Sequence, residues 1–543
     1  MYKNKITQAL LLGAGMTVAA TSFSTIAADV PEDVKLAEKQ ELVRGNGTEV
    51  ESLDPQKVSG VPESNVIRDL LEGLVNQDSN GKLVGGVAES WETTDNQTWV
   101  FNLRKDAKWS NGDPVVASDF VYTWQRLADP KTGSPYASYL EMTTMKNAGD
   151  IIMGKKSPDT LGVEAIDSHT LKITLDQPVP YFASMTVHTS MKPVNAKVVE
   201  ELGDKWTSPE NYVGNGAYKL DNWVVNERIV LTRNDAYWNN AESVLNKVTY
   251  LPIENQVAEM NRFLAGEVDV TYEMPNEHFK RLVKQYPENV KVTPYLCSYY
   301  YEFNTAKAPF NDANVRKALS YAIDRDVIAK FIVGKGETSA YNFTPLATNG
   351  LDVEMPDYSK LSQKERVEKA KSLLAEAGYD SSNPLKFDLL YNTSENHKKV
   401  AVAIASMWQK SLGVTAVLEN QEWKSYLDSK RQGDFDVSRA GWCGDYNEAS
   451  TFLAIMRDGH SQNYPKYESE SYDALLDKAL AAASDSDRSA AYKRAEAQLS
   501  KDMPIMPIYH YVNARLVNPK LGGYPENNPE DNIFSKDLYI IAD

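Results

Sequence analysis

The chain has 543 residues, a formal charge of −17 at pH 7, and 42% hydrophobic and 24% charged residues. These values are those of an ordinary globular protein, and the length predicts two or three lobes rather than a single core. The excess of acidic residues argues against nucleic acid or an anionic membrane as the partner, so we expect a soluble protein that acts on something small.

Residues 1–27 are typical of a secretory signal. Lys3 and Lys5 form a positive head, an apolar run covers 9–20, and residues 25–27 are the small-residue end that a signal peptidase reads. The alternative is a buried N-terminal helix. No later run is long enough for a transmembrane helix, so no membrane insertion is expected. Cleavage would export a chain of 516 residues to the periplasm with a charge of −19, because the signal holds two lysines and no acid.

The exported chain alternates short strands and helices, which predicts an α/β class for its C-terminal half. Runs of β-branched and aromatic residues predict strands over 248–253, 289–293, 386–391 and 414–418. Ser362 and Glu365 form a capping box before a helix that stops at Gly378. Apolar spacing predicts further helices over 396–412, 471–483 and 487–499. The stretch 72–195 is richer in hairpin-like segments and is expected to be a separate mixed lobe.

The chain has two cysteines, Cys297 and Cys443. In an oxidising compartment two cysteines of a large exported chain usually pair, so we expect a disulfide bond rather than two reduced buried thiols. The loop would be long, and the chain-entropy account gives such a bond roughly 4–5 kcal/mol, less any strain in the native state.

Sequence patterns of common catalytic sites are missing. There is no Gly-x-Ser-x-Gly elbow, no His-Glu-x-x-His pair, no P-loop and no Cys-x-x-Cys. The six histidines show no metal-ligand spacing, so neither a metal nor a cofactor is predicted. Carboxylates are plentiful, and the sequence does not rule out a pair of them arranged as in a glycosidase. Together with export, size and acidity, the pattern favours a binding protein over an enzyme.

Several segments resemble one protein family. They include MNRFLAGEVD at 260–269, FNTAKAPFND at 303–312 and VRKALSYAIDR at 315–325. These resemble the extracellular solute-binding proteins of the peptide and nickel class, which serve ABC importers. The segments NTSENH at 392–397 and RAGWCGDYNE at 439–448 narrow the resemblance to periplasmic binders of oligopeptides. The resemblance covers essentially the whole exported chain.

The resemblance implies a periplasmic binding protein type II-like fold, in which two lobes are joined by a two-strand hinge and a third domain is added. It places lobe I at 28–71, 196–296 and 513–543, the extra domain II at 72–195, and lobe III at 297–512. The lobes would close over a short extended peptide. The protein, as a monomer, would deliver that peptide to the membrane permease subunits of an ABC importer.

Broad peptide binding requires contacts with the groups that all peptides share. The ligand backbone would be bound as an added strand. The family positions for this are Ser59, Gly60 and Val61 on one lobe and Gly441, Trp442 and Cys443 on the other. The family usually has an acid where this chain has Ser59.

The two charged ends of a peptide need opposite partners. The resemblance assigns Asp445 to the α-ammonium group, with a turn cap as the structural alternative. It assigns Arg439 and His397 to the carboxylate, and His397 would be cationic or donate through one nitrogen. The structural alternative for His397 is a solvated loop residue.

Two positions differ from the family pattern in ways that bear on peptide length. The family uses a lysine for shorter peptides, and we assign that place to Val333, with Lys330 and Lys335 nearby. Lys430 stands where an arginine is usual.

Pockets for the ligand side chains should be large, wet and walled by aromatic rings. The matching positions are Tyr136, Tyr272, Trp423, Trp442 and Tyr511, with His188 nearby. Core packing is the alternative for each of them.

Other classes of protein stay open at this point. A sugar-binding protein would suit the 30 tyrosines and 10 tryptophans, but neutral sugars need no opposed charges such as Asp445 and Arg439. A nickel or haem carrier, a dipeptide binder and a binder of cell-wall peptides share the same fold. An exported hydrolase is the remaining alternative.

Overall fold

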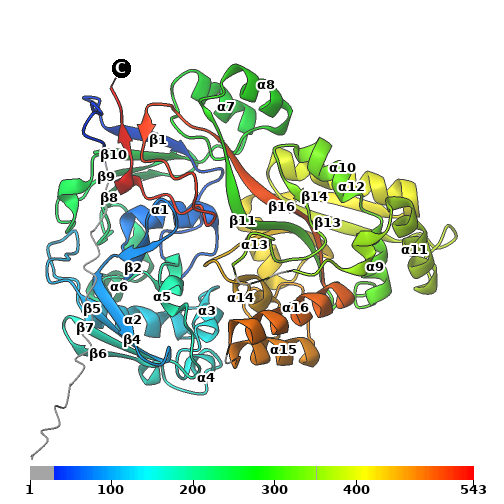
Figure 1. Ribbon diagram of the computed structural model, residues 1–543, viewed down its shortest axis with the longest axis horizontal. Coiled ribbons are helices and arrows are strands. Elements are labelled where there is room, and N and C mark those ends of the chain that lie inside the picture. The colour runs from blue at the N-terminus through cyan, green and yellow to red at the C-terminus, as the bar shows by residue number, and fades with distance from the viewer. Residues whose placement is uncertain (1–29, 350, 352, 483, 543) are drawn as a thin grey trace, which may run out of the picture.

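The computed structural model describes residues 30–349, 351, 353–482 and 484–542. The predicted signal peptide lies outside the described residues. The chain folds as an α/β protein around separate sheets (Figure 1). No helix of the described residues is long and apolar enough to cross a membrane.

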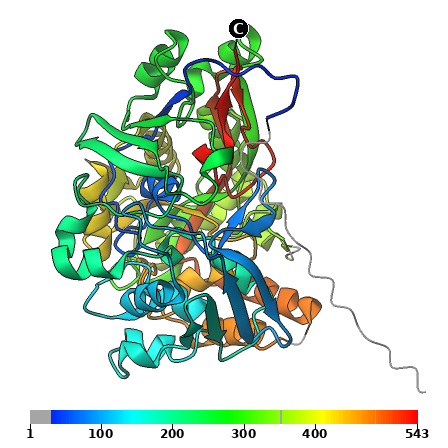
Figure 2. The same ribbon diagram turned by 90° about the vertical axis from the view of Figure 1, so that its left-hand side faces the viewer.

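The first sheet, which we call the sheet of lobe I, has the order β1-β10-β9-β8. Its strands are β1 (Glu41–Gly45), β8 (Tyr218–Val224), β9 (Arg228–Arg233) and β10 (Lys247–Leu251). The helices of lobe I are α1 (Val61–Leu70), α7 (Gln256–Leu264) and α8 (Phe279–Gln285), while α6 (Ala196–Leu202) lies beside α2 of the extra domain (Figure 1). The short strands β17 (Leu521–Gly522) and β18 (Tyr539–Ile540) form a separate two-stranded sheet that contacts the chain before β1, where Ala37 N–H donates to Ile540 O at 2.9 Å. Figure 2 shows the red C-terminal strands above the sheets and close to the blue start of the chain.

The extra domain contains a fully antiparallel sheet in the order β4-β5-β7-β6. Its strands are β4 (Ala88–Thr93), β5 (Thr98–Leu103), β6 (Val163–Asp167) and β7 (Thr170–Thr174), preceded by the hairpin of β2 (Val75–Gln77) and β3 (Leu83–Gly85). Its helices are α2 (Ala117–Ala128), α3 (Ala137–Met142), α4 (Ala148–Ile152) and α5 (Phe182–Met185). The mixed, hairpin-rich character expected for this stretch is confirmed.

Lobe III is built on a six-stranded sheet in the order β12-β16-β11-β15-β13-β14. Its strands are β11 (Val290–Phe303), β12 (Thr338–Ser339), β13 (Lys386–Asn392), β14 (Thr415–Gln421), β15 (Val437–Cys443) and β16 (Ile505–Leu516). Its helices are α9 (Ala313–Tyr321), α10 (Arg325–Val327), α11 (Gln363–Glu376), α12 (Glu395–Leu412), α13 (Trp423–Gln432), α14 (Ser450–Leu453), α15 (Glu470–Leu480) and α16 (Asp485–Asp502).

The predicted elements of the C-terminal half are present. The strands expected at 248–253, 386–391 and 414–418 are β10, β13 and β14, and the strand expected at 289–293 is the start of the longer β11. The capping box before α11 is confirmed, because Ser362 N–H donates to Glu365 Oε2 at 2.8 Å and Glu365 N–H donates to Ser362 Oγ at 3.4 Å. Helix α16 is longer than the expected 487–499, since Ser484 caps its start and Met503 ends it in the left-handed region.

Two long strands, β11 and β16, run together from lobe I into the sheet of lobe III (Figure 1). Val290–Pro294 pairs with Val512–Leu516 beside lobe I, and Ser298–Glu302 pairs with 505–510 inside lobe III. The register shifts between Pro294 and Ser298, so the ladder is interrupted where the chain passes between the lobes. This pair is the two-strand hinge that the family resemblance implied.

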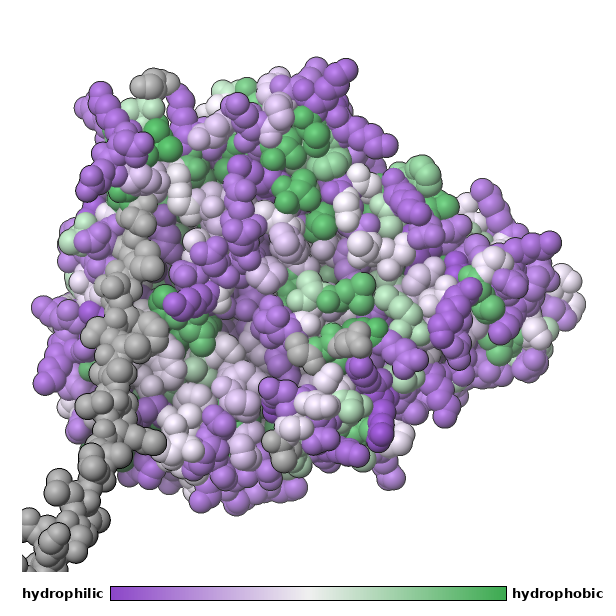
Figure 3. All heavy atoms as spheres, viewed as in Figure 1, coloured by the Kyte–Doolittle hydropathy of each residue, from purple (hydrophilic) through white to green (hydrophobic). Residues whose placement is uncertain are grey.

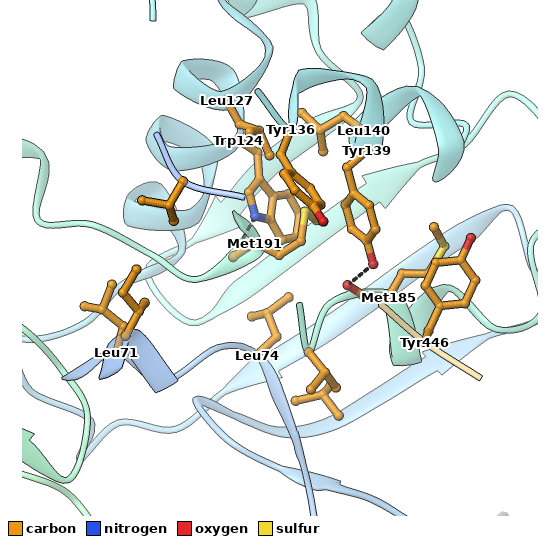
Figure 4. Close-up of a cluster of buried hydrophobic side chains, with 14 of the residues drawn as sticks. Leu71, Leu74, Trp124, Leu127, Tyr136, Tyr139, Leu140, Met185, Met191 and Tyr446 are labelled. Atoms are coloured by element: carbon orange, nitrogen blue, oxygen red, sulfur yellow. Dashed lines mark hydrogen bonds between the residues drawn. The ribbon is translucent and has the colours of Figure 1, made fainter. Parts of the chain in front are cut away.

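Lobe I and the extra domain share one hydrophobic core. Figure 4 shows part of it, in which Trp124 Nε1 donates to Met191 O at 3.0 Å and Tyr139 OH donates to Met185 O at 2.9 Å. Leu71 reaches this cluster from lobe I and Tyr446 from lobe III, whereas Leu74 belongs to the extra domain. The same core continues into lobe III through Trp442, Tyr446 and Phe452, so apolar packing joins all three parts in this arrangement. Over the outside, Figure 3 shows mostly hydrophilic side chains, with hydrophobic residues in small separate patches.

The predicted disulfide is confirmed. Cys297 on β11 and Cys443 on β15 are direct cross-strand partners and form a disulfide bond. The bond ties the hinge strand to the strand beside it, within the sheet of lobe III.

We expect the double variant Cys297→Ser/Cys443→Ser to unfold at a lower denaturant concentration than the native protein. The bond closes a loop with a sequence separation of 146, for which the chain-entropy account predicts a loss of roughly 4–5 kcal/mol. Urea unfolding followed by tryptophan fluorescence measures the effect. An unchanged midpoint would mean that the bond contributes nothing to stability.

Candidate functional site

A cavity of about 290 Å³ lies between lobe I, the extra domain and lobe III. Each of the fourteen ligand-binding residues expected from the sequence lines it. They are Ser59, Gly60, Val61, Tyr136, His188, Tyr272, His397, Trp423, Arg439, Gly441, Trp442, Cys443, Asp445 and Tyr511. Segments far apart in the sequence therefore meet at one place, and the roles assigned to these residues stay predictions.

Strand β15 offers the cavity an open backbone edge. One side of β15 pairs with β11 from Val437 to Cys443. In the part of the chain that the structure describes, β13 pairs with the other side only at Val437 and Ser438. The C=O group of Arg439 accepts from Tyr426 OH, so the free edge runs from Ala440 to Cys443, where alternate residues turn N–H and C=O groups away from β11. An extended chain in the cavity could add to this edge as a further strand.

The opposite wall is formed by the start of α1. Gly60 precedes the helix with extended backbone (φ −102°, ψ 153°). A Cβ atom at this position would come within 2.0 Å of Glu63 Oε2, so glycine lets the backbone lie directly on that carboxylate.

Asp445 keeps one carboxylate oxygen free. Its Oδ1 accepts a hydrogen bond from Tyr136 OH at 3.3 Å, and His188 Nε2 lies 3.2 Å from the same oxygen. His188 Nδ1 accepts from the backbone N–H of Ser190 at 3.2 Å, which leaves Nε2 as the ring nitrogen that donates. Oδ2 has no hydrogen-bond partner among the described residues, although it is buried. A buried, unpartnered carboxylate oxygen is a strong acceptor for a ligand cation.

Aromatic rings form the wall beside Asp445. Tyr136 stacks on His188 with ring centroids 4.6 Å apart and lies nearly parallel to Trp442 at 6.2 Å. Burial, followed by the charge of Asp445, raises the pKa of the Tyr136 hydroxyl well above its usual value. The hydroxyl therefore stays protonated and donates to Asp445.

Arg439 is a buried cation without a carboxylate partner. Its Nη2 donates to Tyr511 OH at 2.6 Å and its Nη1 to Asn392 Oδ1 at 3.3 Å. Its guanidinium carbon lies 4.7 Å from the ring centroid of Tyr299. It forms no salt bridge within the described ranges, and its Nε has no acceptor there. Burying such a charge costs free energy that an anionic group of a ligand would recover.

His397 is a neutral residue in this cavity. Burial, and then the charges of Arg439 and Lys335, hold its pKa well below the usual range. Its Nδ1 has no hydrogen-bond partner among the residues that the structure describes. Of the two states expected from the sequence, the lowered pKa favours the neutral ring that donates through one nitrogen.

The positions discussed for peptide length, Val333, Lys335 and Lys430, place no unpaired cation at the cavity wall. Val333 packs in the hydrophobic core of lobe III. Lys335 Nζ lies 2.7 Å from Glu273 Oε1 and 3.6 Å from Glu337 Oε1. Lys430 Nζ lies 2.9 Å from Glu302 Oε1 in the interior of lobe III. Each of these two lysines is therefore neutralised by the protein itself.

The sequence did not reveal a contact that joins the lobes beside the cavity. Arg431 donates from Nη1 and Nη2 to the two carboxylate oxygens of Glu51 at 2.8 and 2.9 Å. Glu63 Oε1 accepts from the backbone N–H of Glu51 at 2.7 Å and from Trp423 Nε1 at 3.3 Å. Since Trp423 and Arg431 both belong to α13 of lobe III, we call these four residues the α13 latch. Burial raises the pKa of Glu63 to about 7.

Several lining residues were also missed because their partners are distant in sequence. Arg515 donates to both oxygens of Asp531 at 2.8 and 2.6 Å. Glu273 bridges the lobes, since its Oε1 accepts from Asn396 Nδ2 at 2.8 Å as well as from Lys335. Glu530 lies near Asp445 and has no sequence motif that would mark it. Single acids in loops carry no pattern from which a cavity could be inferred.

The geometry is that of a two-lobe binding protein, in which a cleft between hinged lobes encloses a ligand. The family described as bacterial extracellular solute-binding proteins, family 5 Middle, matches residues 82–464. The periplasmic oligopeptide-binding protein OppA of Salmonella typhimurium is 55% identical over 99% of this chain and 99% of its own. The chain belongs to this family of solute-binding proteins.

Solved structures agree with this assignment. The structure of Haemophilus influenzae OppA in complex with RPPGFSPFR is 51% identical, with a TM-score of 0.92 over 94% of this chain and 100% of that chain. The Escherichia coli murein tripeptide binding protein MppA gives 50% identity and a TM-score of 0.93 over 94% of this chain and 100% of that chain.

The lobes of this structure are closed. A second structure of a murein tripeptide-binding MppA, described as its unliganded open form, gives a TM-score of only 0.67 at the same 50% identity over 94% of this chain and 99% of that chain. Since the identity is equal, the arrangement of the lobes accounts for the difference. The α13 latch and the enclosed cavity are features of the closed arrangement.

We expect the imidazole of His397 to stay neutral from pH 8 down to pH 5, because burial and two neighbouring cations oppose its protonation. Histidine ring signals followed by NMR across this range measure it, and the spectrum of His397→Gln identifies the signal. A titration midpoint near the usual histidine value would contradict the neutral assignment.

Proposed function

We propose that the protein captures short peptides in extended form between its closing lobes in the periplasm and delivers them to the permease subunits of an ABC importer. The observation that carries the proposal is the pair of opposed, unsatisfied charges, Asp445 and Arg439, on either side of the free edge of β15. A peptide has an ammonium group, a strand-like backbone and a carboxylate in that order. The names of the relatives and the peptide complex of one of them support it.

The spacing of these charges favours peptides of a few residues. Asp445 follows Arg439 by six positions, which along an extended strand corresponds to about 20 Å between their backbones. The two side chains extend into this gap and shorten it by several ångströms. The remainder suits a ligand of about three to four extended residues, at ~3.3 Å per residue. Longer peptides would have to place their carboxylate elsewhere.

Further parts of the proposal follow from the relatives and the sequence. Periplasmic location is supported by the relatives' names and by the predicted signal peptide. A monomer is favoured because the cavity is completed by segments of one chain. A neutral sugar would leave Asp445 Oδ2 and Arg439 Nε without a charged partner, which argues against a sugar as ligand.

We expect Asp445→Asn to weaken the binding of a tripeptide with a free α-amine, because a charge-assisted contact becomes a neutral one. The expected loss is roughly 2–5 kcal/mol, the range for breaking a buried charge pair. Isothermal titration calorimetry measures it, and the N-acetylated form of the same tripeptide serves as the control ligand.

The N-acetyl tripeptide should bind weakly to the native protein and be barely affected by the substitution. An equal loss of affinity for both forms would show that Asp445 has a structural role. If neither form binds the native protein, peptide capture itself is refuted.

The α13 latch leads to a separate expectation. Arg431→Gln should weaken all peptides by the same factor, because the latch holds the lobes closed without being part of either charged subsite. The loss should be about 1 kcal/mol, as for a partly exposed ion pair. The matched control is Arg457→Gln, whose partner Asp477 lies 2.5 Å away within lobe III. Losses that depend on the peptide sequence would argue that Arg431 contacts the ligand.

A further inference from the structure

A second carboxylate, Glu530, lines the cavity beside the proposed ammonium site. It belongs to the loop between β17 and β18. Its Oε2 accepts a hydrogen bond from Gln77 Nε2 at 2.9 Å, and Asn532 Nδ2 lies 3.5 Å from the same oxygen. These amides orient the carboxyl group without neutralising it.

The backbone of Leu296 holds Glu530 and Asp445 close together. The N–H group of Leu296 donates to Pro529 O at 2.7 Å, and its C=O group accepts from Gly444 N–H at 2.8 Å. Glu530 directly follows Pro529, and Asp445 directly follows Gly444. The residues that precede the two acids are therefore hydrogen-bonded to a single residue of the hinge strand β11.

The charged groups around Glu530 do not neutralise its carboxyl group, so a ligand cation would find an unpaired acid there. Burial is the main reason that its pKa rises to about 7, and the negative charge of Asp445 raises it further. Arg68 opposes this effect, but its Nη2 donates to Asn532 Oδ1 at 2.7 Å and its Nη1 to Asn65 Oδ1 at 3.3 Å. Asp445 Oδ2 is itself buried and has no partner among the described residues. One ammonium group could thus neutralise only one of two adjacent carboxyl groups.

We propose that Glu530 is a specificity-determining residue that selects peptides with a cationic side chain on their first residue. The α-ammonium group of such a peptide binds Asp445, and the side-chain ammonium or guanidinium group binds Glu530. A peptide with an apolar first side chain would leave Glu530 either protonated or as a buried charge without a counter-ion, and both cost free energy. This inference rests on the proposed function and concerns the same cavity.

The test compares Lys-Ala-Ala with norleucine-Ala-Ala, which has a first side chain of similar length without the charge. Isothermal titration calorimetry gives both affinities for the native protein and for Glu530→Gln. The native protein should prefer the lysine peptide by about tenfold or more, as expected for a desolvated charge pair. Glu530→Gln should remove this preference by weakening the lysine peptide, and should leave the norleucine peptide within about twofold.

The matched control is Glu254→Gln, which removes an acid from the same cavity at a place where its Oε1 lies 3.3 Å from Thr48 Oγ1. It should keep the preference for lysine. If Glu254→Gln and Glu530→Gln lower the preference equally, the general charge of the cavity is responsible and the assignment to Glu530 is overturned. An equal loss for both peptides in Glu530→Gln, or no loss for either, also overturns it.

A measurement on the native protein covers the case in which the variant does not fold. Calorimetry at pH 7 in two buffers of different ionisation enthalpy counts the protons released on binding. The lysine peptide should release about half a proton more than the norleucine peptide, because Glu530 becomes fully ionised beside the cation. Equal proton release would refute the contact. Failure of both peptides to bind would refute the proposed function, whereas equal binding of both would refute this inference alone.

Discussion

The closed protein buries charges that it does not neutralise. Asp445 keeps one oxygen without a partner, and Arg439 forms no salt bridge in the described part of the chain. A desolvated charge of this kind is costly, and the cost falls when a ligand supplies the opposite charge. The closed arrangement therefore depends on what fills the cavity. This constraint explains why both charges lie at a seam between mobile parts rather than inside one rigid lobe.

The hinge strands and the α13 latch are the parts that allow the lobes to open and close. Strands β11 and β16 continue from lobe I into the sheet of lobe III, and in the closed arrangement one hydrophobic core also packs the extra domain against lobe III. Helix α13 carries Trp423 and Arg431 to the facing acids Glu63 and Glu51. Water can replace these polar contacts when the cleft opens, whereas the ring contacts of Tyr446 with Tyr139 and Tyr181 would lose their burial. Ligand contacts then decide the balance between the two arrangements.

The sequence predicted much of this structure, and the failures have a common cause. Strands β10, β13 and β14 and the capping box of α11 follow from local patterns, and the Cys297–Cys443 bond follows from the compartment and a count of two. The fourteen cavity residues came from motifs shared with a family. Glu63 and Arg431 were missed because their partners lie hundreds of residues away in the sequence. Glu530 was missed because its role depends on burial, which a short stretch of sequence does not show. The neutral state of His397 was undecided for the same reason, since the neighbouring cations Arg439 and Lys335 are brought to it only by the fold.

The free edge of β15 has a further consequence for what can enter the cavity. An unpaired strand edge on the outside of a protein invites other strands and promotes aggregation. Here the edge from Ala440 to Cys443 lies at the wall of a cleft, with the start of α1 and the extra domain on the far side. The strand of a folded protein is attached to its own sheet and is too bulky to reach it. Only a short chain that has already lost its tertiary structure can pair there, so the depth of the cleft separates degraded chains from intact ones before any side chain is recognised.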